Sequence, residues 1–143
     1  MSECPICEKH KRQVSPIYED KNWVVTHGPL VSQILGYMYI EPKRHVENWS
    51  DFTDEELSKV GPLIKRLELA LKNELDIDRV YVVTISEAVR HIHFHIIPRI
   101  EGNHVKGLDL IAQATQQRNM NKVALEINSF DNVYLNITKS LDR

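Results

Sequence analysis

Three histidines alternate with apolar residues in one short segment of the chain. The segment reads His91-Ile92-His93-Phe94-His95-Ile96-Ile97. On a β-strand, successive side chains point to opposite faces, so the apolar residues would face a core and the imidazoles, about 7 Å apart, would share the other face. Imidazoles grouped in this way suit chemistry on a small anion or a metal ion. A polar outer face that happens to be histidine is the alternative, but the chain has only seven histidines and three fall within five residues.

Two cysteines, Cys4 and Cys7, form a C-x-x-C pair. In a reducing compartment this spacing favours a metal or redox pair over a structural disulfide. Structural zinc takes four protein ligands, and Cys₂His₂ is one of its usual sets. His10, three residues after Cys7, is one candidate for a further ligand. A redox pair is less favoured, because no thioredoxin-like βαβ pattern surrounds the cysteines; a reduced pair without metal is a further alternative.

The histidine segment resembles the motif of the histidine triad family, H-φ-H-φ-H-φ-φ with φ apolar, at every position. Pro98-Arg99 is similar to the family's common continuation, and the segment 41–45, EPKRH, precedes the predicted long helix as in that family. The resemblance covers about residues 1–100. It implies an α+β fold with an antiparallel β-sheet and one long helix. It also implies that the protein forms a homodimer and binds a nucleotide as its substrate.

The resemblance also implies a mechanism. His93 would attack the α-phosphate of a nucleotide and expel a leaving group. Water or another acceptor would then release the nucleotide from a nucleotidyl-histidine intermediate. His95 would donate to a non-bridging phosphate oxygen. Arg99 would bind substrate through its charge, although a solvated cation at a strand end is an equal alternative. The expected activity is that of a nucleotide phosphoramidase or a dinucleoside polyphosphate hydrolase.

For the cysteine pair, the resemblance implies a structural zinc. Some family members combine an N-terminal C-x-x-C with a histidine before the long helix and with the first histidine of the triad. Carried onto this chain, the metal ligands are Cys4, Cys7, His45 and His91. His10 is the alternative to His45. The zinc would serve as scaffolding that ties the N-terminal segment to the strand carrying His93.

One loop departs from the family pattern. The family usually places a glycine-containing loop, ending in Gly-Gln and a hydroxyl residue, before the triad. Aligned without gaps, Ser86 replaces the glycine, Glu87 the glutamine and Ala88 the hydroxyl residue. A glycine-free loop brings fewer backbone N–H groups to a phosphate. An ionised Glu87 would repel the anion unless it is protonated, points away, or faces a neutral or cationic leaving group.

Two alternatives to the enzyme follow. The chain could be a zinc-stabilised nucleotide-binding module with weak or no catalysis. In the other alternative, the triad itself holds a catalytic metal, since two strand histidines can bind zinc and leave an open position.

The elements that position these residues follow from hydrophobic patterning. Thr53 and Glu56 form a capping box that starts a long helix ending near Leu75, and Gly61-Pro62 predicts a kink or interruption in it. Segments rich in β-formers predict strands, the last two as a hairpin: 23–26, 36–41, 79–85 and 91–97. Beyond Gly102 the pattern weakens; it is compatible with a helix over 108–118 and a strand over 133–137.

The whole chain is of ordinary globular composition. With 143 residues, 42% hydrophobic and 27% charged, it predicts a single domain over 1–143 with an unassigned tail from about 101. The net charge of −2 argues against a broad surface for a nucleic-acid polymer or a membrane. The N-terminus resembles no signal peptide and no apolar stretch is long enough to span a membrane, so we expect a cytoplasmic protein.

Overall fold

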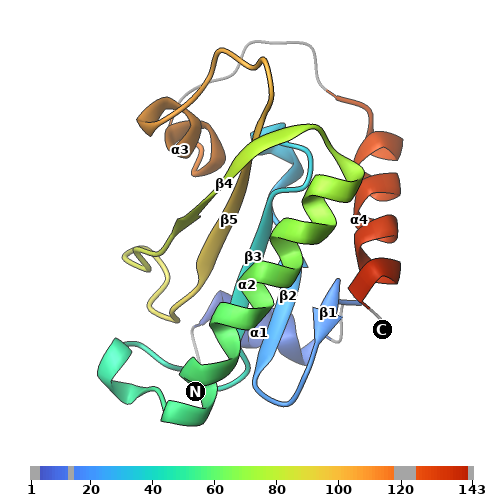
Figure 1. Ribbon diagram of the computed structural model, residues 1–143. Helices are drawn as coiled ribbons and strands as arrows, with labels where there is room; N and C mark the ends of the chain where they lie inside the picture. Colours follow the sequence, from blue (N-terminus) through green and yellow to red (C-terminus); the bar gives the residue numbers. More distant parts are fainter. Residues whose placement is uncertain (1–3, 13–14, 118–124, 142–143) are drawn as a thin grey trace.

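A five-stranded antiparallel sheet forms the centre of the molecule, in the order β1-β2-β3-β5-β4 (Figure 1). The computed structural model describes residues 4–12, 15–117 and 125–141. The strands are β1 (Tyr18–Glu19), β2 (Trp23–His27), β3 (Met38–Pro42), β4 (Ile77–Val83) and β5 (Phe94–Ile100). The helices are α1 (Pro5–Lys11), α2 (Asp54–Glu74), α3 (Leu108–Ala114) and α4 (Ile127–Leu141), with short 3₁₀ turns at Leu30–Ser32 and Trp49–Asp51. The predicted α+β class is confirmed.

The larger core lies between one face of the sheet and the helices α2 and α4. Leu67 and Leu71 of α2 and Ile137 of α4 have no exposed surface. Full burial of a side chain of this size stabilises the fold by about 2 kcal/mol. The sheet contributes alternate residues of its central strands to this core, among them Val25, Met38, Ile40, Phe94 and Ile96.

Helix α4 lies where the sequence predicted a strand over 133–137, and that prediction is wrong. The buried residues of this segment are Phe130, Tyr134, Ile137 and Leu141. They recur every three or four positions, which is the helical period. A five-residue window is too short to distinguish this period from a strand. The described part of the chain therefore has two long helices rather than one.

Helix α2 begins as predicted. The side chain of Thr53 accepts from the backbone N–H of Glu56, and the Glu56 carboxylate accepts from the backbone N–H of Thr53. The helix is unbroken across Pro62, so the predicted interruption is wrong. Gly61 and Pro62 lie on the exposed side of α2, while Leu63 and Leu67 pack into the core. Packing of that face offsets the hydrogen bond that proline removes.

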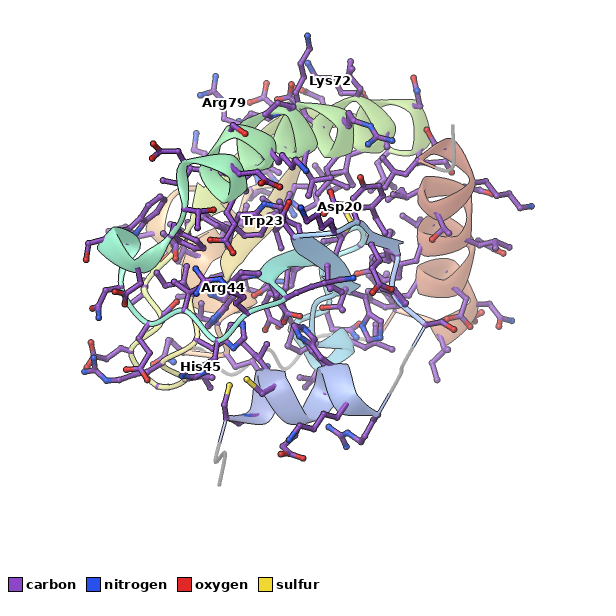
Figure 2. All side chains as sticks on the ribbon, turned by 90° about the horizontal axis from the view of Figure 1, so that it is seen from below. Asp20, Trp23, Arg44, His45, Lys72 and Arg79 are labelled. Carbon is purple, nitrogen blue, oxygen red and sulfur yellow. The ribbon has the colours of Figure 1, made fainter. Side chains whose placement is uncertain are left out.

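The opposite face of the sheet carries α1 and a smaller core under α3. Seen from below, α1 and α2 lie on opposite sides of the sheet (Figure 2). The smaller core contains Ile34, Tyr37, Ile97, Leu110 and Ala114. Because side chains alternate along a strand, Tyr39 and His95, which are paired across β3 and β5, point to this second face. The second face therefore carries the polar residues of the central strands.

Strand β5 begins at Phe94 rather than His91 and continues through Pro98 to Ile100. Pro98 is tolerated because β3 pairs only as far as Ile96, so at Pro98 the ladder continues to β4 alone. Residues 91–93 are held instead by contacts outside the strand ladder; for example, the backbone N–H of Ile92 donates to the carbonyl of Val46 at 2.7 Å. The predicted strand therefore includes His95, whereas His91 and His93 lie before it.

The C-terminal part confirms the predicted helix from Leu108, which ends at Ala114. The predicted end at Arg118 lies outside the described residues. None of the helices in the described ranges combines the length and the apolar character that a membrane span requires.

Candidate active site and metal centre

A pocket of about 330 Å³ lies on the second face of the sheet, beside the loop that joins β4 to β5. His93 and His95 form one part of its wall, together with Tyr39 from β3. The loop adds Ile85, Ser86, Glu87, Ala88 and Val89, and the end of α3 adds Ala114, Thr115, Gln116 and Gln117. The ring centroids of His93 and His95 are 5.0 Å apart, so both imidazoles can reach one small group in the pocket.

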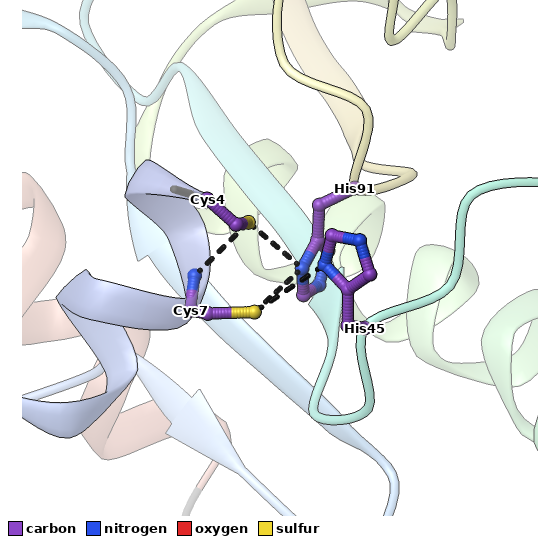
Figure 3. Close-up of side chains that lie close together, drawn as sticks. All are labelled: Cys4, Cys7, His45 and His91. Atoms are coloured by element: carbon purple, nitrogen blue, oxygen red, sulfur yellow. Dashed lines mark hydrogen bonds between the residues drawn. The ribbon is translucent and has the colours of Figure 1, made fainter. Parts of the chain in front are cut away.

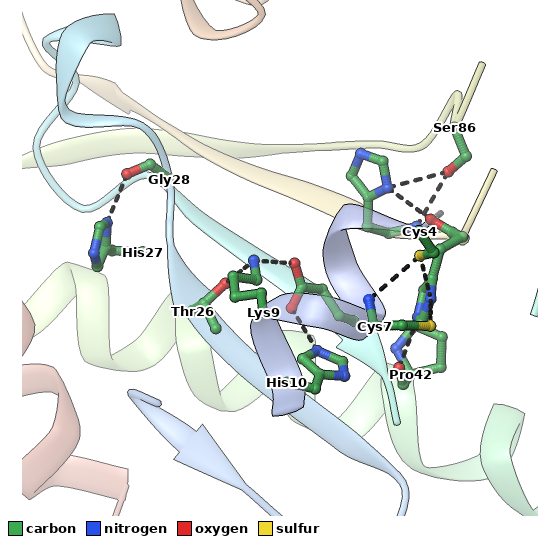
Figure 4. Close-up of polar contacts among 12 residues, drawn as sticks. Cys4, Cys7, Lys9, His10, Thr26, His27, Gly28, Pro42 and Ser86 are labelled. Carbon is green, nitrogen blue, oxygen red and sulfur yellow. Dashed lines mark hydrogen bonds and ion pairs between the residues drawn. The ribbon is translucent and has the colours of Figure 1, made fainter. Parts of the chain in front are cut away.

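The tautomer of His93 follows from its partner. Nδ1 of His93 lies 2.8 Å from the main-chain carbonyl oxygen of His91. A carbonyl oxygen can only accept, so Nδ1 of the neutral ring carries the proton and Nε2 carries the lone pair. The backbone N–H of His93 donates to Oγ of Ser86 at 3.1 Å (Figure 4). His93 is therefore oriented at both its ring and its main chain, with a nucleophilic nitrogen available.

His95 is a neutral, buried imidazole. Burial, and after it the nearby His93, lower the pKa of His95 to about 4. Its Nδ1 lies 2.7 Å from the hydroxyl of Tyr37, which is itself buried and whose ring stacks on His95. This contact holds the ring through one nitrogen and leaves Nε2 for a ligand.

Tyr37 is in turn fixed by its surroundings. The hydroxyl of Tyr134 on α4 and the backbone N–H of Gly28 both donate to the main-chain carbonyl of Tyr37, at 2.6 and 2.7 Å. Gly28 also lies directly against the tyrosine ring, because a Cβ atom at position 28 would be 2.5 Å from Cδ2 of Tyr37. Tyr37, the partner of His95, is thus held in place by Gly28, which follows β2, and by Tyr134 of α4.

The loop before the triad compensates in part for its lack of glycine. Ser86 adopts a left-handed backbone with φ of 54°, a conformation that costs a non-glycine residue about 1–2 kcal/mol. This is the position at which the gap-free alignment places the family's glycine. Oγ of Ser86 accepts from the backbone N–H of His93 and lies 3.4 Å from Nδ1 of His93. Because that Nδ1 carries the proton donated to the His91 carbonyl, the Ser86 proton remains for another acceptor.

Glu87 lies at the edge of the pocket, with its charge directed to solvent. Its carboxylate pairs with Arg90 at 2.9 Å, and the Glu87 side chain is 76% exposed. The sequence left three ways for Glu87 to avoid repelling a phosphate: protonation, a carboxylate that points away, or a leaving group without negative charge. The geometry corresponds to the second. Arg99 is not brought to the pocket. Its guanidinium pairs with Asp78 of β4 at 2.6 Å, and it does not line the pocket wall.

Several residues of the pocket were not predicted from the sequence. Tyr39 could have been found, because Tyr37 and Tyr39 alternate with Met38 and Ile40 and so must share the face opposite the core. The wall formed by residues 115–117 has no comparable signal. It depends on the way α3 folds back over the sheet.

The four residues proposed as zinc ligands converge from three separate parts of the chain (Figure 3). The donor atoms of Cys4, Cys7, His45 and His91 all lie within 4.8 Å of one another. Nδ1 of His91 is 3.4 Å from each sulfur, and Nδ1 of His45 is 3.4 Å from Sγ of Cys7. Ligands of a tetrahedral zinc, 2.3 Å from sulfur and 2.0–2.1 Å from nitrogen, are about 3.6 Å apart. The donor set and its spacing are those of a closed, structural zinc site.

Contacts behind the ligands fix both imidazoles in the correct tautomer. Nε2 of His91 donates to the carbonyl of Pro42 at 2.9 Å, and Nε2 of His45 lies 2.9 Å from the carboxylate of Glu47. Each histidine therefore presents an unprotonated Nδ1 to the metal, as zinc-binding histidines require. Burial lowers the pKa of His91. At Cys4, burial opposes ionisation, but hydrogen bonds with Cys7 and His45 outweigh it and lower the pKa of the thiol.

His10 is not a metal ligand, so the alternative that placed it in the site is wrong. Its Nε2 lies 2.9 Å from the fully buried carboxylate of Glu41, which also pairs with Lys9 at 2.6 Å (Figure 4). The alternative of a metal held by the triad itself is not supported either. Within 4–12, 15–117 and 125–141, only the Cys4 cluster groups three or more metal-binding side chains.

Comparisons with known proteins identify the family to which the fold and the triad belong. Residues 11–102 match the model of the HIT domain. An uncharacterised HIT-like protein of Methanocaldococcus jannaschii is 31% identical over 106 residues, which cover 66% of this chain and 81% of that protein.

Two solved structures share the fold. A hypothetical histidine triad nucleotide-binding protein of Sulfolobus tokodaii superposes with a TM-score of 0.69 at 20% identity, covering 96% of this chain and 91% of that one. A zinc-bound histidine triad family protein of Mycobacterium smegmatis gives a TM-score of 0.61 at 22% identity, covering 80% and 95%. With the triad, the sheet and the family model in agreement, this chain belongs to the HIT domain family, a group of nucleotide-binding hydrolases and transferases.

Proposed function

We propose that this protein is a nucleotide hydrolase or nucleotidyltransferase that attacks the α-phosphate of its substrate through Nε2 of His93. The observation that carries the proposal is the hydrogen bond of 2.8 Å from Nδ1 of His93 to the His91 carbonyl. It keeps the lone pair on the nitrogen that is free to react. Neutral imidazole is an effective nucleophile near pH 7.

The reaction has two steps. In the first, the lone pair of Nε2 forms a bond to phosphorus, and the bond from phosphorus to the leaving group breaks with its electron pair, which takes up a proton from solvent. In the second, water attacks phosphorus and gives up a proton to solvent, the P–N bond breaks with its electron pair restored to Nε2, and the nucleotide leaves. During both steps Nδ1–H stays on the His91 carbonyl, which stabilises the positive charge of the substituted ring.

Two further groups support the phosphate. With Tyr37 donating to Nδ1 of His95, the proton of the neutral ring resides on Nε2 and can be donated to a non-bridging oxygen. The hydroxyl proton of Ser86 is available for a second oxygen, because its oxygen already accepts from the His93 amide. Ser86 would then take over part of the role that a glycine-rich loop has with its backbone amides.

The charge around the pocket favours substrates with little negative charge beyond the α-phosphate. No lysine or arginine is among the described residues that line it, and Glu87 lies at its edge. A nucleoside phosphoramidate fits this environment better than a dinucleoside polyphosphate, because its leaving group is an amine. The binding module with little catalysis remains the second candidate, favoured by the replacement of the loop glycine by Ser86.

We also propose a cytoplasmic homodimer. Cys4 and Cys7 form no disulfide in the structure, and zinc-thiolate sites of this kind persist in reducing compartments. The dimer rests on the family resemblance. Light scattering of the purified protein measures its mass in solution.

The proposed nucleophile is tested with the variant His93→Ala. The wild-type protein and the variant are incubated with adenosine and guanosine phosphoramidates and with dinucleoside polyphosphates. We expect turnover to fall by more than a hundredfold, since loss of a nucleophile has effects at least this large. We also expect intact mass spectrometry of quenched wild-type protein to detect a nucleotidyl adduct on His93.

His104→Ala is the matched control, because His104 is exposed in a loop outside the pocket. It should retain full activity. Turnover in His93→Ala above about a hundredth of the wild type would remove His93 from this role. Nucleotide binding without turnover in the wild type would favour the binding module.

A further inference from the structure

His91 takes part in two sites at once. Its ring nitrogen Nδ1 faces both cysteine sulfurs of the metal site at 3.4 Å. Its main-chain carbonyl accepts the Nδ1 proton of His93 at 2.8 Å. A single residue therefore joins the metal centre to the group that selects the reactive nitrogen of the proposed nucleophile.

The peptide of His91 is held in part through its side chain. Residues 91–93 precede β5, so the sheet ladder does not align them. The ring of His91 is fully buried, with Nε2 donating to the Pro42 carbonyl and Nδ1 directed at the metal site. Beyond the ring, this stretch is held by Ile92, whose N–H donates to Val46, and by the bond from the His93 N–H to Ser86.

Loss of the metal would remove one of these constraints. Three of the sulfur–nitrogen pairs lie 3.4 Å apart, close to the separation that a tetrahedral ion sets, and without the ion each thiol can pair with either histidine in more than one way. The ring of His91 would then turn or shift within the site. A shift of the whole residue would carry its carbonyl along, against the hold of the Ile92 N–H, which belongs to the same peptide unit and donates to Val46.

We infer that His91 is a positioning residue through which occupancy of the metal site fixes the tautomer and orientation of His93. With metal bound, His93 holds its proton on Nδ1. Without metal, part of the population transfers the proton to Nε2, and the lone pair no longer faces the pocket. A neutral hydrogen bond contributes about 1 kcal/mol, so we expect the ratio of the two tautomers to change by about fivefold.

The tautomers are measured directly by NMR of ¹⁵N-labelled protein. Long-range ¹H–¹⁵N correlations distinguish the protonated from the unprotonated ring nitrogen of each histidine, at a pH where the ring is neutral. The spectra are compared for zinc-loaded protein, protein treated with a chelator, and the variant His45→Ala. Among the described residues no contact joins His45 directly to His93, so an effect of His45→Ala on His93 passes through His91 or through the hydrogen bond from Ile92 to Val46.

Glu41→Gln is the matched control. Glu41 anchors α1 through Lys9 and His10 but is not a metal ligand. Loosening of α1 alone should leave the His93 ring signals in place, whereas loss of the metal should move them. His104 serves as an internal reference, since it lies in an exposed loop.

A folded sample is needed for every comparison. If the metal-free protein unfolds, replacement of zinc by cadmium provides the test, because the larger ion moves its ligands while the chain stays folded. We expect the His93 ring nitrogens to shift on replacement and those of His104 to stay unchanged. Unchanged His93 signals after metal removal from folded protein, or after cadmium replacement, would overturn the inference.

This inference rests on the proposed function only in so far as the tautomer of His93 affects the rate of nucleotide turnover. The NMR measurement needs no substrate, so it can fail while His93 is still the nucleophile. Equally, His93 can prove inactive while its tautomer follows the metal.

Discussion

The buried imidazole of His95 makes the stability of the protein depend on pH. Burial first, and then His93, lower the pKa of His95 from 6.5 to about 4. Below pH 6.5 the unfolded chain therefore binds a proton that the folded chain excludes. The free energy of unfolding should fall as the pH decreases from about 6.5 toward 4. Between pH 7 and pH 5 we expect a loss of roughly 2 kcal/mol from this residue, measured by urea denaturation.

The variant His95→Gln isolates this effect. It cannot bind the proton, so its unfolding free energy should change less between pH 7 and pH 5 than that of the wild type. A variant with the full wild-type pH dependence would assign the effect to another group.

Glu87 tests the substrate class. The carboxylate is at the edge of the pocket, paired with Arg90 and largely exposed. Exposure screens its charge, so the repulsion of a phosphate amounts to less than 1 kcal/mol. We expect Glu87→Gln to raise kcat/KM for dinucleoside polyphosphates by a few-fold and to leave phosphoramidates unchanged or slower.

Glu101→Gln provides the comparison, since Glu101 is exposed and does not line the pocket. It should affect neither substrate class. Equal effects of Glu87→Gln on both classes, or no effect on either, would place Glu87 outside the working site.

Helix α2 depends on one side chain at its first turn. The Glu56 carboxylate accepts from the Thr53 backbone and from two nitrogens of Arg44. The Arg44 hydrogen bond is the largest cause that lowers the pKa of Glu56 to about 2. Its contribution to stability is thus present above pH 4.5 and lost as the pH falls from 4.5 to about 2. We expect Glu56→Gln to lower the free energy of unfolding at pH 7 by about 2 kcal/mol.

Glu55→Gln is the neighbouring control. The Glu55 side chain is half-exposed and pairs with exposed lysines, so its loss should change stability much less than the loss of Glu56. Comparable losses from both substitutions in urea denaturation at pH 7 would show that the capping contacts of Glu56 are unimportant.

At the level of elements, the sequence predicted what short-range patterns encode. The capping box at Thr53 depends on residues three apart, and the strand at Trp23 on a local run of β-formers. The predictions were wrong where contacts between residues far apart in the sequence determine the local structure. Residues 91–93 leave the strand ladder because His91 is held by the metal site and Pro42. Helix α2 continues through Pro62 because its other face is buried.

For the molecule as a whole, the metal site joins α1 to the rest of the fold. This helix has seven residues, too few to be stable alone. Ile6 and the ion pairs of Glu41 are its other anchors. We expect one zinc per chain in the purified protein. Its removal should lower Tm and speed hydrogen exchange in residues 4–12 more than in α2.

Elemental analysis and calorimetry provide the measurements. The variant Cys4→Ser should reproduce the effect of a chelator, while His10→Ala should retain the metal. A protein that contains no metal and keeps its Tm after treatment with a chelator would contradict the prediction.

The residues of the two sites could be predicted from the sequence where they belong to a recognisable motif. The C-x-x-C pair, the triad and, for His45, the family resemblance led to the four ligands that the fold brings together, and the triad led to the two histidines of the pocket. Thr115, Gln116 and Gln117 were not predictable, because their place in the wall depends on the packing of α3. The partner of His95 was missed for a similar reason, since Tyr37 reads in the sequence as one more β-former.

The contact between Gly28 and the ring of Tyr37 limits how this sequence can drift over evolutionary time. Position 28 lies in the connection after β2, a kind of segment that usually tolerates substitution. Here any side chain would displace the ring that touches His95. A change at this position therefore becomes acceptable only after a smaller residue replaces Tyr37, and the two positions must vary together in descendants that keep His95 in its present setting.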